Sequence, residues 1–513
     1  MPIITPKNRT QIELKSLEDF IEKDNTVRFI DAFVEKLELD KLRFANKIVK
    51  TEGRPSFTNQ LFLKLYFYGY LNGIRSSRKL AKECARNIEM QWLCNGLTPN
   101  YHSIADFRKV NSQALRNTFK LFVSFLKDAD LVMGSVIAVD GTKARAHNSK
   151  KNNYNHKKID RHFAYIEEKT NQYLKELDEA DKQEQNERVK NIEEKLEKLK
   201  TQKLKYDTLQ TQLQQSNEPQ VSTTDKDARA LLVHGQVVEV SYNTQAAVDD
   251  KHKLVVATHT INKNDRNALS KITLEAKENL QVENFTLLAD KGYNNAKEIE
   301  ACQTAGITTI VAQQEIVNSN AKGTTKDYLV TNFIYNKDSD TYTCPQQQTL
   351  TTTGTWHSKQ REHSSHKFKK YRTTACKTCA ALKLCTAKAD GRREIERSEY
   401  AEAMELNNKN YKEHYQLYRK RQEINEHIFG TIKRVWGYYY TNLKGLKKVN
   451  GEWALIMTVY NMKRTVNILG FDTLMQKLNA WKPEYKKEWL ALNKINVFNC
   501  HIRTLFFEYK IAA

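Results

Sequence analysis

The chain has 513 residues, of which 83 are Lys or Arg and 61 are Asp or Glu, and its formal charge is +22 at pH 7. This length exceeds the ~250 to 300 residues at which one hydrophobic core usually stops growing, so we expect two or more domains. An apolar fraction of 40% excludes global disorder, and the basic excess favours nucleic acid as partner over an anionic membrane surface. The N-terminus has no apolar signal-peptide core and no apolar run approaches the ~20 residues of a spanning helix, which predicts a cytoplasmic protein without a membrane partner.

The first 130 residues are predicted to form an all-helical domain. Apolar residues recur at helical spacing after Asp24, a plausible N-cap, and a second apolar stretch covers residues 61–71. Two further helices are expected over Ser76–Asn87 and Ser103–Leu126. Basic residues on these helices indicate either DNA binding or a solvated face, and those favoured for DNA contact are Arg75, Arg78 and Arg108.

A mixed pattern of strands and helices follows. Residues 136–139 form a β-branched run that leads into Asp140, which predicts a buried strand with an acid at its carboxyl end. Residues 285–289 lead into Asp290 in the same way. This alternation predicts an α/β domain. The other expected strands are Val237–Val248, Leu254–Ile261 and Thr308–Ala312, and the expected helices are Ala268–Leu280 and Asn295–Ala305.

A polar segment between the first two strands, Asn155–Asn217, contains almost no Gly or Pro. Its apolar residues fit an interrupted heptad register, so we expect an inserted helical hairpin. The apolar stripe is consistent with packing on itself, on a second subunit or on DNA, and a self-packed spacer is the simplest interpretation.

A second insertion, over residues 320–400, is expected to be basic and rich in loops, and it contains four cysteines. Four thiolates complete the tetrahedral shell of Zn²⁺, which predicts a structural zinc site, and reduced thiols are the alternative. The cysteines are Cys344, Cys376, Cys379 and Cys385, with His357, His363 and His366 as spare ligands.

A third acid, Glu426, lies in a basic amphipathic stretch, Tyr411–Trp436, that we expect to be helical. Sites in open α/β sheets collect at the carboxyl ends of strands, where Asp140 and Asp290 are expected. Carboxylates that hold two Mg²⁺ ions activate the attacking oxygen and stabilise the leaving oxygen when a phosphodiester is cleaved. The three acids therefore indicate a metal-dependent phosphodiester site, although acids at strand ends are also common without such a role.

Three segments resemble the acidic motifs of bacterial insertion-sequence DDE transposases. These are Asp140-Gly-Thr-Lys-Ala-Arg-Ala-His-Asn-Ser149, Leu287-Leu-Ala-Asp-Lys-Gly-Tyr293 and Glu426-His-Ile-Phe-Gly-Thr-Ile-Lys433. Residues 71–80 and 102–108 resemble the helical N-terminal domain of that family, residues 242–248 its second core strand and residues 459–464 its closing helix. The resemblance covers roughly residues 20 to 465 in the family's order.

The resemblance implies a cut-and-paste DNA transposase. Its helical DNA-binding domain would span residues 1–130, an α/β RNase H-like core of mixed sheet and flanking helices residues 131–465, and a helical tail residues 466–513. Asp140, Asp290 and Glu426 would hold two Mg²⁺ (or Mn²⁺) ions. The enzyme would bind terminal inverted repeats, cleave the DNA ends and join the 3′-hydroxyl to target DNA, as a homodimer in the nucleoid. The alternatives are a stand-alone metal-dependent nuclease and an inactive, transposase-derived DNA-binding protein.

The family also carries a Tyr, an Arg and a Lys that hold DNA-end phosphates, and by position these are Tyr418, Arg421 and Lys433. Four residues rather than three separate Arg421 from Glu426, and one extra residue turns a helix by about 100°. Glu423 lies one turn before Glu426 with its charge on nearly the same face, and it is a rival third ligand. Glu426 is preferred because the match on its C-terminal side is unbroken.

Overall fold

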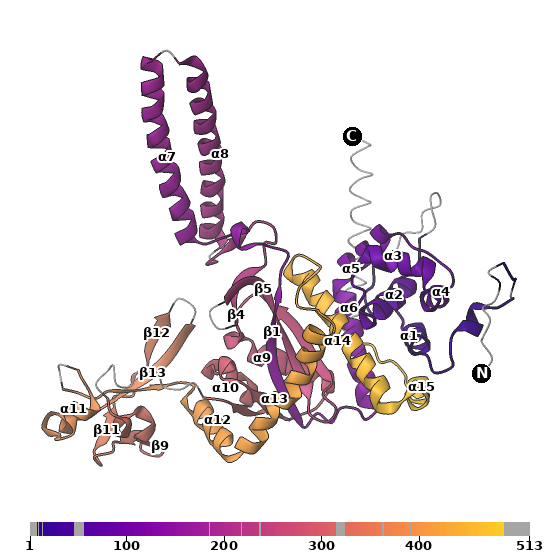
Figure 1. The fold of residues 1–513 in the computed structure, drawn as a ribbon. Helices are drawn as coiled ribbons and strands as arrows, with labels where there is room; N and C mark the ends of the chain where they lie inside the picture. The colour runs from indigo at the N-terminus through magenta and orange to yellow at the C-terminus, as the bar shows by residue number, and fades with distance from the viewer. Residues whose placement is uncertain are drawn as a thin grey trace, which may run out of the picture.

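The computed structural model describes residues 8, 10–12, 14–45, 56–183, 185–216, 218–234, 237–313, 324–361, 364–388 and 391–486. Figure 1 shows a central body from which a long helical arm and a small β-rich lobe extend in different directions. Within the described residues, no helix combines the length and the apolar composition needed to cross a membrane.

The N-terminal region is helical, but two of its helix starts differ from expectation. The first long helix follows Asn25 rather than Asp24, because the Asn25 side chain accepts a hydrogen bond from the Val27 N–H at 2.9 Å. The expected helix over residues 103–126 is two helices that meet at Asn111, whose buried amide bonds to the Phe107 carbonyl and to the Ala45 N–H. The elements are η1 (Leu17–Phe20), α1 (Thr26–Glu35), α2 (Asn59–Leu71), α3 (Ser77–Arg86), α4 (Ile88–Leu93), α5 (Tyr101–Val110) and α6 (Ser112–Asp128).

The central sheet is mixed. Its strand order is β4-β5-β1-β7-β8, and β6 also pairs with the long strand β5. Strand β1 is antiparallel to β5 and parallel to β7, which is parallel to β8. The strands are β1 (Val136–Arg145), β4 (Arg229–His234), β5 (Val237–Asp249), β6 (Val255–Ile261), β7 (Thr286–Ala289) and β8 (Thr308–Val311).

Asp140 lies inside β1 and not at its end, which corrects the expectation from sequence. On one side the parallel pairing stops at Val139 and Ala289, immediately before Asp140. On the other side β5 provides backbone partners as far as Arg145, so the strand continues past the acid. Asp140 is therefore at the carboxyl end of the parallel β1–β7 pair only.

Helices from both ends of the chain cover this sheet. Helix α9 packs against β6 and β5, α13 against β1 and β7, and α14 against β6, α6 and α2. The N-terminal helices and the sheet thus share one continuous apolar core that extends from Ile21 to Trp481. The helices are α9 (Leu269–Leu280), α10 (Ala296–Thr304), α12 (Ala401–Glu413), α13 (Tyr415–Phe429), the π-helical turn η9 (Gly430–Val435), α14 (Leu446–Leu469) and α15 (Phe471–Ala480). Residues 487–513 of the expected tail lie outside the described residues.

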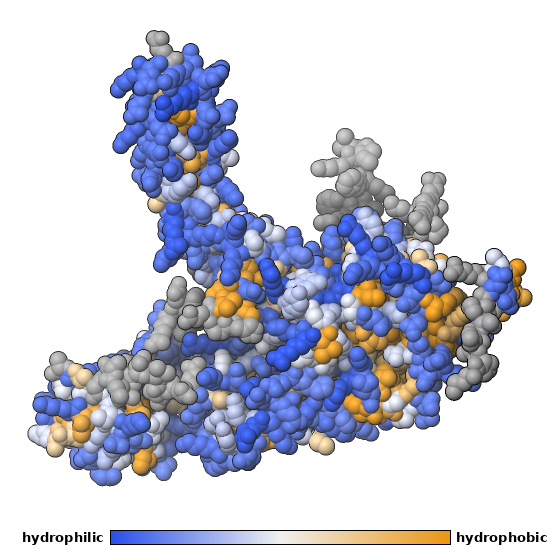
Figure 2. All heavy atoms as spheres, viewed as in Figure 1, coloured by the Kyte–Doolittle hydropathy of each residue, from blue (hydrophilic) through white to orange (hydrophobic). Residues whose placement is uncertain are grey.

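The arm is a hairpin of two helices, α7 (His156–Lys182) and α8 (Asn186–Ser216), at the position expected from the sequence. The helices pack on each other along an apolar seam that includes Ile159, Leu199 and Tyr206. Figure 2 shows a hydrophilic surface over most of the visible side of the arm. Residues 156–216 contain 13 basic and 13 acidic residues, so the net positive charge belongs to the rest of the chain. Short strands β2 (Asn153–Tyr154) and β3 (Val221–Ser222) pair at the base of the arm.

The second insertion, expected to be rich in loops, forms a small antiparallel sheet that we call the β lobe (residues 324–361, 364–388 and 391–398). Its strand order is β12-β13-β11-β10-β9, and β14 pairs with β13. A separate small core contains Phe333, Tyr342, Leu350, Tyr371 and Ile395. The elements are β9 (Ile334–Asn336), β10 (Thr341–Thr343), β11 (Thr349–Thr352), β12 (His357–Arg361), β13 (Ser364–Arg372), η8 (Thr374–Thr378), α11 (Leu382–Cys385) and β14 (Ile395–Ser398).

A fully buried carboxylate, Glu452 on α14, connects the N-terminal helices to the part of the chain that contains the central sheet. The Arg75 guanidinium donates to Glu452 Oε1 at 2.8 Å, and Arg108 Nη1 lies 3.9 Å from the same oxygen. The backbone N–H groups of Asn442 and Leu443 donate to Glu452 Oε2 at 3.0 and 3.1 Å. Burial raises the pKa of Glu452, but the two arginines outweigh that effect and lower it, so the carboxylate is charged.

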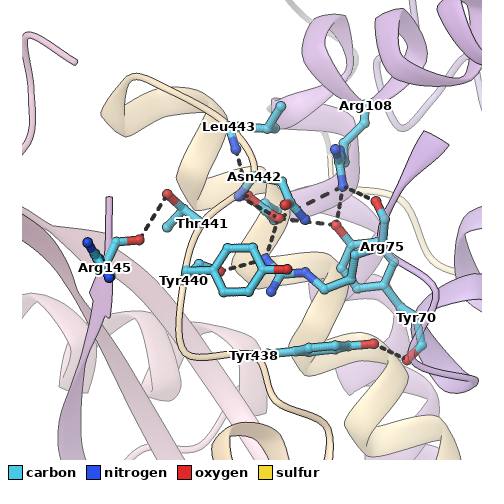
Figure 3. A network of polar contacts seen from close by, with 10 residues as sticks. Tyr70, Arg75, Arg108, Arg145, Tyr438, Tyr440, Thr441, Asn442 and Leu443 are labelled. Atoms are coloured by element: carbon cyan, nitrogen blue, oxygen red, sulfur yellow. Dashed lines mark hydrogen bonds and ion pairs between the residues drawn. The ribbon is translucent and has the colours of Figure 1, made fainter. Parts of the chain in front are cut away.

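The loop held by Glu452 is also bonded to the strand that carries Asp140 (Figure 3). The Arg145 N–H donates to the Tyr439 carbonyl at 2.9 Å, and the Thr441 N–H donates to the Arg145 carbonyl at 2.9 Å. Arg75 Nη2 donates to the Tyr440 carbonyl at 2.7 Å. Glu452 and its partners therefore fix three parts together: the N-terminal helices, the end of β1 and the chain segment that follows α13.

Replacement of Glu452 is expected to destabilise the whole fold. Glu452→Gln preserves the shape but leaves two buried guanidinium groups without a counter-charge, so the free energy of unfolding should fall by about 3 to 5 kcal/mol. Urea unfolding followed by circular dichroism measures this change. Glu278→Gln is the control, because Glu278 is 45% exposed and pairs with Lys120 and Lys486 at the surface, so a loss below about 1 kcal/mol is expected. Equal losses in the two variants would contradict this role of Glu452.

Candidate active site

Two of the predicted acids, Asp140 and Asp290, lie side by side where β1 and β7 separate. They directly follow the paired residues Val139 and Ala289 on neighbouring strands, which are spaced about 4.8 Å apart in a sheet. The Gly141 N–H donates to Asp140 Oδ1 at 2.7 Å. Asp290 caps the short helix η4 (Lys291–Tyr293), and the Gly292 N–H donates to Asp290 Oδ1 at 2.8 Å. Both carboxylates are thus oriented by backbone donors of the turns that follow them.

The electrostatic environment of Asp140 disfavours its negative charge. Burial raises the pKa of Asp140 to about 6, and the charges of Asp290 and Asp265 add to this effect. The Gly141 N–H and the Arg421 guanidinium, whose Nη1 lies 3.6 Å from Asp140 Oδ2, act in the opposite direction. A carboxylate whose ionised form is destabilised in this way gains from a nearby cation.

A third aspartate, Asp265, lies behind this pair and was missed in the sequence. Asn243 Nδ2 and Gln245 Nε2 donate to its Oδ1 at 2.8 and 2.9 Å, and Lys143 Nζ donates to its Oδ2 at 2.7 Å. Burial opposes ionisation, but Lys143 and these hydrogen bonds lower the pKa of Asp265. Both oxygens of Asp265 therefore already accept hydrogen bonds from side chains of β1 and β5. The sequence signal that could have located Asp265 is its position four residues after the predicted strand Leu254–Ile261. In the structure it begins the short helix η3 (Asp265–Asn267).

The Asp265 network packs closely against the backbone of β1. A Cβ atom at Gly141 would lie 2.5 Å from both Asp265 Oδ1 and Gln245 Nε2, so only glycine fits beside Asp140. The Tyr293 hydroxyl, at the end of the turn that begins with Asp290, donates to Gln245 Oε1. The network thus connects the backbone next to Asp140 with the turn that holds Asp290.

Helix α13 covers β1 and β7 with the face that contains Arg421, Ile424, Asn425 and Ile428. Asn425 occupies the position where the family spacing, counted from Arg421, would place the glutamate. Its side chain is 1% exposed, and neither amide atom has a hydrogen-bond partner among the described residues. Buried amides are usually hydrogen-bonded, so this position is unusual.

The two rival third acids lie away from that face of α13. Glu426 is five residues after Arg421, about 140° around the helix axis. It is exposed and accepts a hydrogen bond from Gln422 at 2.7 Å. Glu423 is 74% exposed and lies 3.5 Å from Lys253 Nζ. In the part of the chain that the structure describes, no three His, Cys, Asp or Glu side chains are close enough to hold a metal ion, so the third acid is not at ligand distance from the pair.

Arg421 in α13 and Lys433 in the turn that follows α13 both contact β1. After α13 the helix continues as the π-helical turn η9, in which the Trp436 N–H donates to the Thr431 carbonyl at 3.0 Å. Lys433 in this turn donates to the Lys143 carbonyl at 3.1 Å, and burial together with the Lys143 charge lowers the pKa of Lys433. Tyr418 lies one turn before Arg421, with its ring centre 5.8 Å from that guanidinium.

Two of the three N-terminal arginines expected to contact DNA are not accessible. Arg75 and Arg108 are each 6% exposed, and both are directed at Glu452. Their charge is used inside the protein, which corrects that expectation. Arg78 is exposed, and its guanidinium lies 5.1 Å from the Tyr101 ring centre.

Basic side chains of the β lobe also have acidic partners. Lys359 lies 3.1 Å from Glu396, and Lys370 lies 3.2 Å from Glu394. The four cysteines expected to bind zinc line one cavity of the lobe. His357 and His366 pack beside Phe368 on β12 and β13, and His363 lies outside the described residues.

Comparison with known protein families gives two matches. Residues 15–110 match the family described as Transposase domain (DUF772), and residues 343–466 match the family described as Transposase DDE domain. No curated protein and no solved structure matches the chain. The first match covers the N-terminal helices, and the second covers Glu426, Arg421 and Lys433 but not Asp140 or Asp290. Together with the three acidic motifs, these matches identify the chain as an insertion-sequence DDE transposase.

Proposed function

We propose that this transposase binds the terminal inverted repeats of its element, hydrolyses the DNA at those ends and joins the freed 3′-hydroxyl to target DNA. The main support is the Asp140–Asp290 pair at the carboxyl end of the parallel β1–β7 pairing, under a helix that carries Glu426 and Arg421. The proposal treats this sheet as an RNase H-like core, which its mixed strand directions and flanking helices support. A homodimer on paired DNA ends is part of the same proposal.

The proposed cofactors are two Mg²⁺ or Mn²⁺ ions, held by Asp140, Asp290 and Glu426. Carboxylate oxygens are the ligands that these cations prefer. When bound, the ions activate the attacking oxygen and stabilise the leaving oxygen. The fit is supported by Asp140, because a cation would offset the burial and like charges that disfavour its ionised form. Glu426 would have to turn toward the pair, and Arg421 would have to yield part of its contact with Asp140.

The remaining residues of the site act by orientation and by charge. The Gly141 and Gly292 N–H groups aim the two aspartates, and the Asp265 network fixes the backbone next to Asp140. Arg421 and Lys433, with Tyr418, would bind the phosphates of the DNA end, because partly buried cations gain strongly from phosphate contact. Exposed Arg78 is proposed to contact DNA as well, and the net charge outside the arm would attract the duplex.

Substitution of each acid should abolish cleavage but not binding. Asp140→Asn, Asp290→Asn and Glu426→Gln are each expected to slow Mg²⁺-dependent cutting of a terminal-repeat duplex by about 10³-fold or more, because bound metal supplies several kcal/mol of transition-state stabilisation. Gel assays measure the cutting, and fluorescence anisotropy in Ca²⁺ measures retained binding.

The matched control for this series is Glu423→Gln, on the same helix, which should cut normally. Loss of cutting in Glu423→Gln with normal cutting in Glu426→Gln would make Glu423 the third ligand. Equal cutting of duplexes with and without the terminal repeat would favour a general nuclease. Binding without scission in either metal would favour an inactive DNA-binding protein.

Stability should depend on pH and on Mg²⁺ through Asp140. The pKa of Asp140 is about 6 in the folded chain and about 3.9 when unfolded. The folded state therefore binds the carboxyl proton of Asp140 more tightly than the unfolded state does. The stability that this proton contributes is lost as the pH rises from about 4 to about 6. Asp140→Asn removes this dependence. Between pH 4 and pH 7.5, the free energy of unfolding of wild type should therefore fall by about 1 to 3 kcal/mol more than that of Asp140→Asn.

Urea unfolding at both pH values measures this difference. Mg²⁺ at pH 7.5 should raise the melting temperature of wild type but not of Asp140→Asn, since metal that binds only the folded state stabilises it. Identical pH profiles and no Mg²⁺ effect on either protein would refute the electrostatic account of the pair.

A further inference from the structure

Four cysteines of the β lobe lie in the wall of one small cavity. Cys344 follows β10, Cys376 lies in η8, Cys379 ends that turn and Cys385 ends α11. All four line a cavity of about 30 Å³, and roughly 10 to 15 Å³ on this measure is enough for one water molecule. The cavity therefore has room for a single ion, and the four cysteines in its wall come from two separate segments of the chain.

The cavity wall provides sulfur ligands and no competing acid. It contains the four cysteines but no carboxylate and no histidine. None of the four is in a disulfide within the described residues. Soft thiolate sets of this kind select Zn²⁺ over Mg²⁺.

The backbone around Cys344 is arranged to support a thiolate. Gln347 adopts a left-handed conformation with φ of 58°, and its N–H donates to the Cys344 carbonyl at 2.8 Å. This turn directs the next N–H, that of Gln348, at Cys344 Sγ at 3.3 Å. A backbone donor to sulfur stabilises the charged form of the ligand and fixes its direction.

A cation close to the cavity offers charge compensation. Four thiolates around Zn²⁺ carry a net charge of −2, which a nearby positive group would stabilise. Arg393 lines the same cavity as the four cysteines. Its Nε is buried and has no hydrogen-bond partner among the described residues. This donor is therefore available for a thiolate sulfur.

The β lobe also has little else to stabilise it. Its core contains five buried residues and is separate from the main core of the protein. Cys344 and Cys385, which are far apart in the sequence of the lobe, both pack against this small core. Small units with so few buried apolar side chains usually need a metal or a disulfide.

We propose that Cys344, Cys376, Cys379 and Cys385 bind one structural Zn²⁺ ion, which joins the β10–β11 turn to the η8–α11 segment. The sulfur atoms are not yet at mutual ligand spacing in the described part of the chain, so binding would draw them inward to Zn–S distances of about 2.3 Å. Each thiol that becomes a ligand releases its proton to solvent. This site is separate from the aspartate pair and does not depend on the proposed catalysis.

The test is the zinc content of the full-length protein, reconstituted with equimolar Zn²⁺ and measured by atomic emission. Wild type should contain about one zinc per chain, and the double variant Cys376→Ser with Cys379→Ser should contain almost none. Two controls should keep the wild-type content: Cys84→Ala, a buried cysteine of α3, and Asp140→Asn in the aspartate pair. Absence of zinc from wild type, or unchanged zinc in the double variant, would overturn the proposal, and loss in Asp140→Asn would assign the ion to the aspartates.

A second measurement needs no variant and so does not depend on a variant's folding. Titration of the metal-free wild-type protein with Co²⁺ should produce the visible bands and the sulfur charge-transfer band of tetrahedral thiolate-bound Co²⁺, and equimolar Zn²⁺ should remove them. A Co²⁺ spectrum without sulfur bands would refute the site. A thiol titration in denaturant that finds the four cysteines paired as disulfides, with no metal bound, would also refute it.

Discussion

The rest of the structure depends on the placement of one buried negative charge, that of Glu452. A carboxylate with no exposed surface is costly unless it is paired and fully hydrogen-bonded, and Arg75, Arg108 and two backbone N–H groups meet that need. The two arginines belong to the N-terminal region, and the two N–H groups belong to the loop that follows η9. The N-terminal helices, this loop and helix α14 must therefore all be in position before the charge is satisfied. The N-terminal helices and the α/β region, which were expected to be separate domains, therefore pack together around one core.

The same loop fixes the end of β1, and this connects the Glu452 cluster with the candidate active site. Arg145 exchanges backbone hydrogen bonds with Tyr439 and Thr441, five residues along the strand from Asp140. At the other end of the site, the Asp265 network holds Gly141 and the Asp290 turn. Two aspartates are thus rigidly placed, whereas the acids of α13 are exposed and paired elsewhere. Metal binding would therefore have to reorient an acid of α13 rather than the aspartates.

The sequence was informative where structure is decided locally. A short apolar run followed by an acid is a local signal, and it located the strands that lead into Asp140 and Asp290, but it did not indicate that these strands pair or that β1 continues past Asp140. The two helices of the arm could also be predicted, since long heptad stripes without Gly or Pro leave few alternatives to paired helices. The burial of Arg75 and Arg108 could not be predicted, because their partner Glu452 lies 377 residues from Arg75 and nothing near either arginine in the sequence indicates burial. The β lobe was missed because its strands are short and rich in Thr and Lys, without clean apolar alternation. Asp265 was missed because the three side chains that bond to it lie on two strands, β1 and β5. The break between two helices at Asn111 was missed because the Ala45 N–H that bonds to the Asn111 side chain is distant in sequence.

The central claim is that a catalytic metal binds at Asp140 and Asp290 and recruits Glu426 from α13. Its most direct test is to replace Mg²⁺ with Fe²⁺ in the DNA complex, generate hydroxyl radicals at the bound iron, and map the backbone cuts by mass spectrometry. The account predicts cuts clustered around residues 140, 290 and 426, each suppressed by excess Mg²⁺. Cuts that leave residues 140 and 290 intact, or that Mg²⁺ does not suppress, would contradict it.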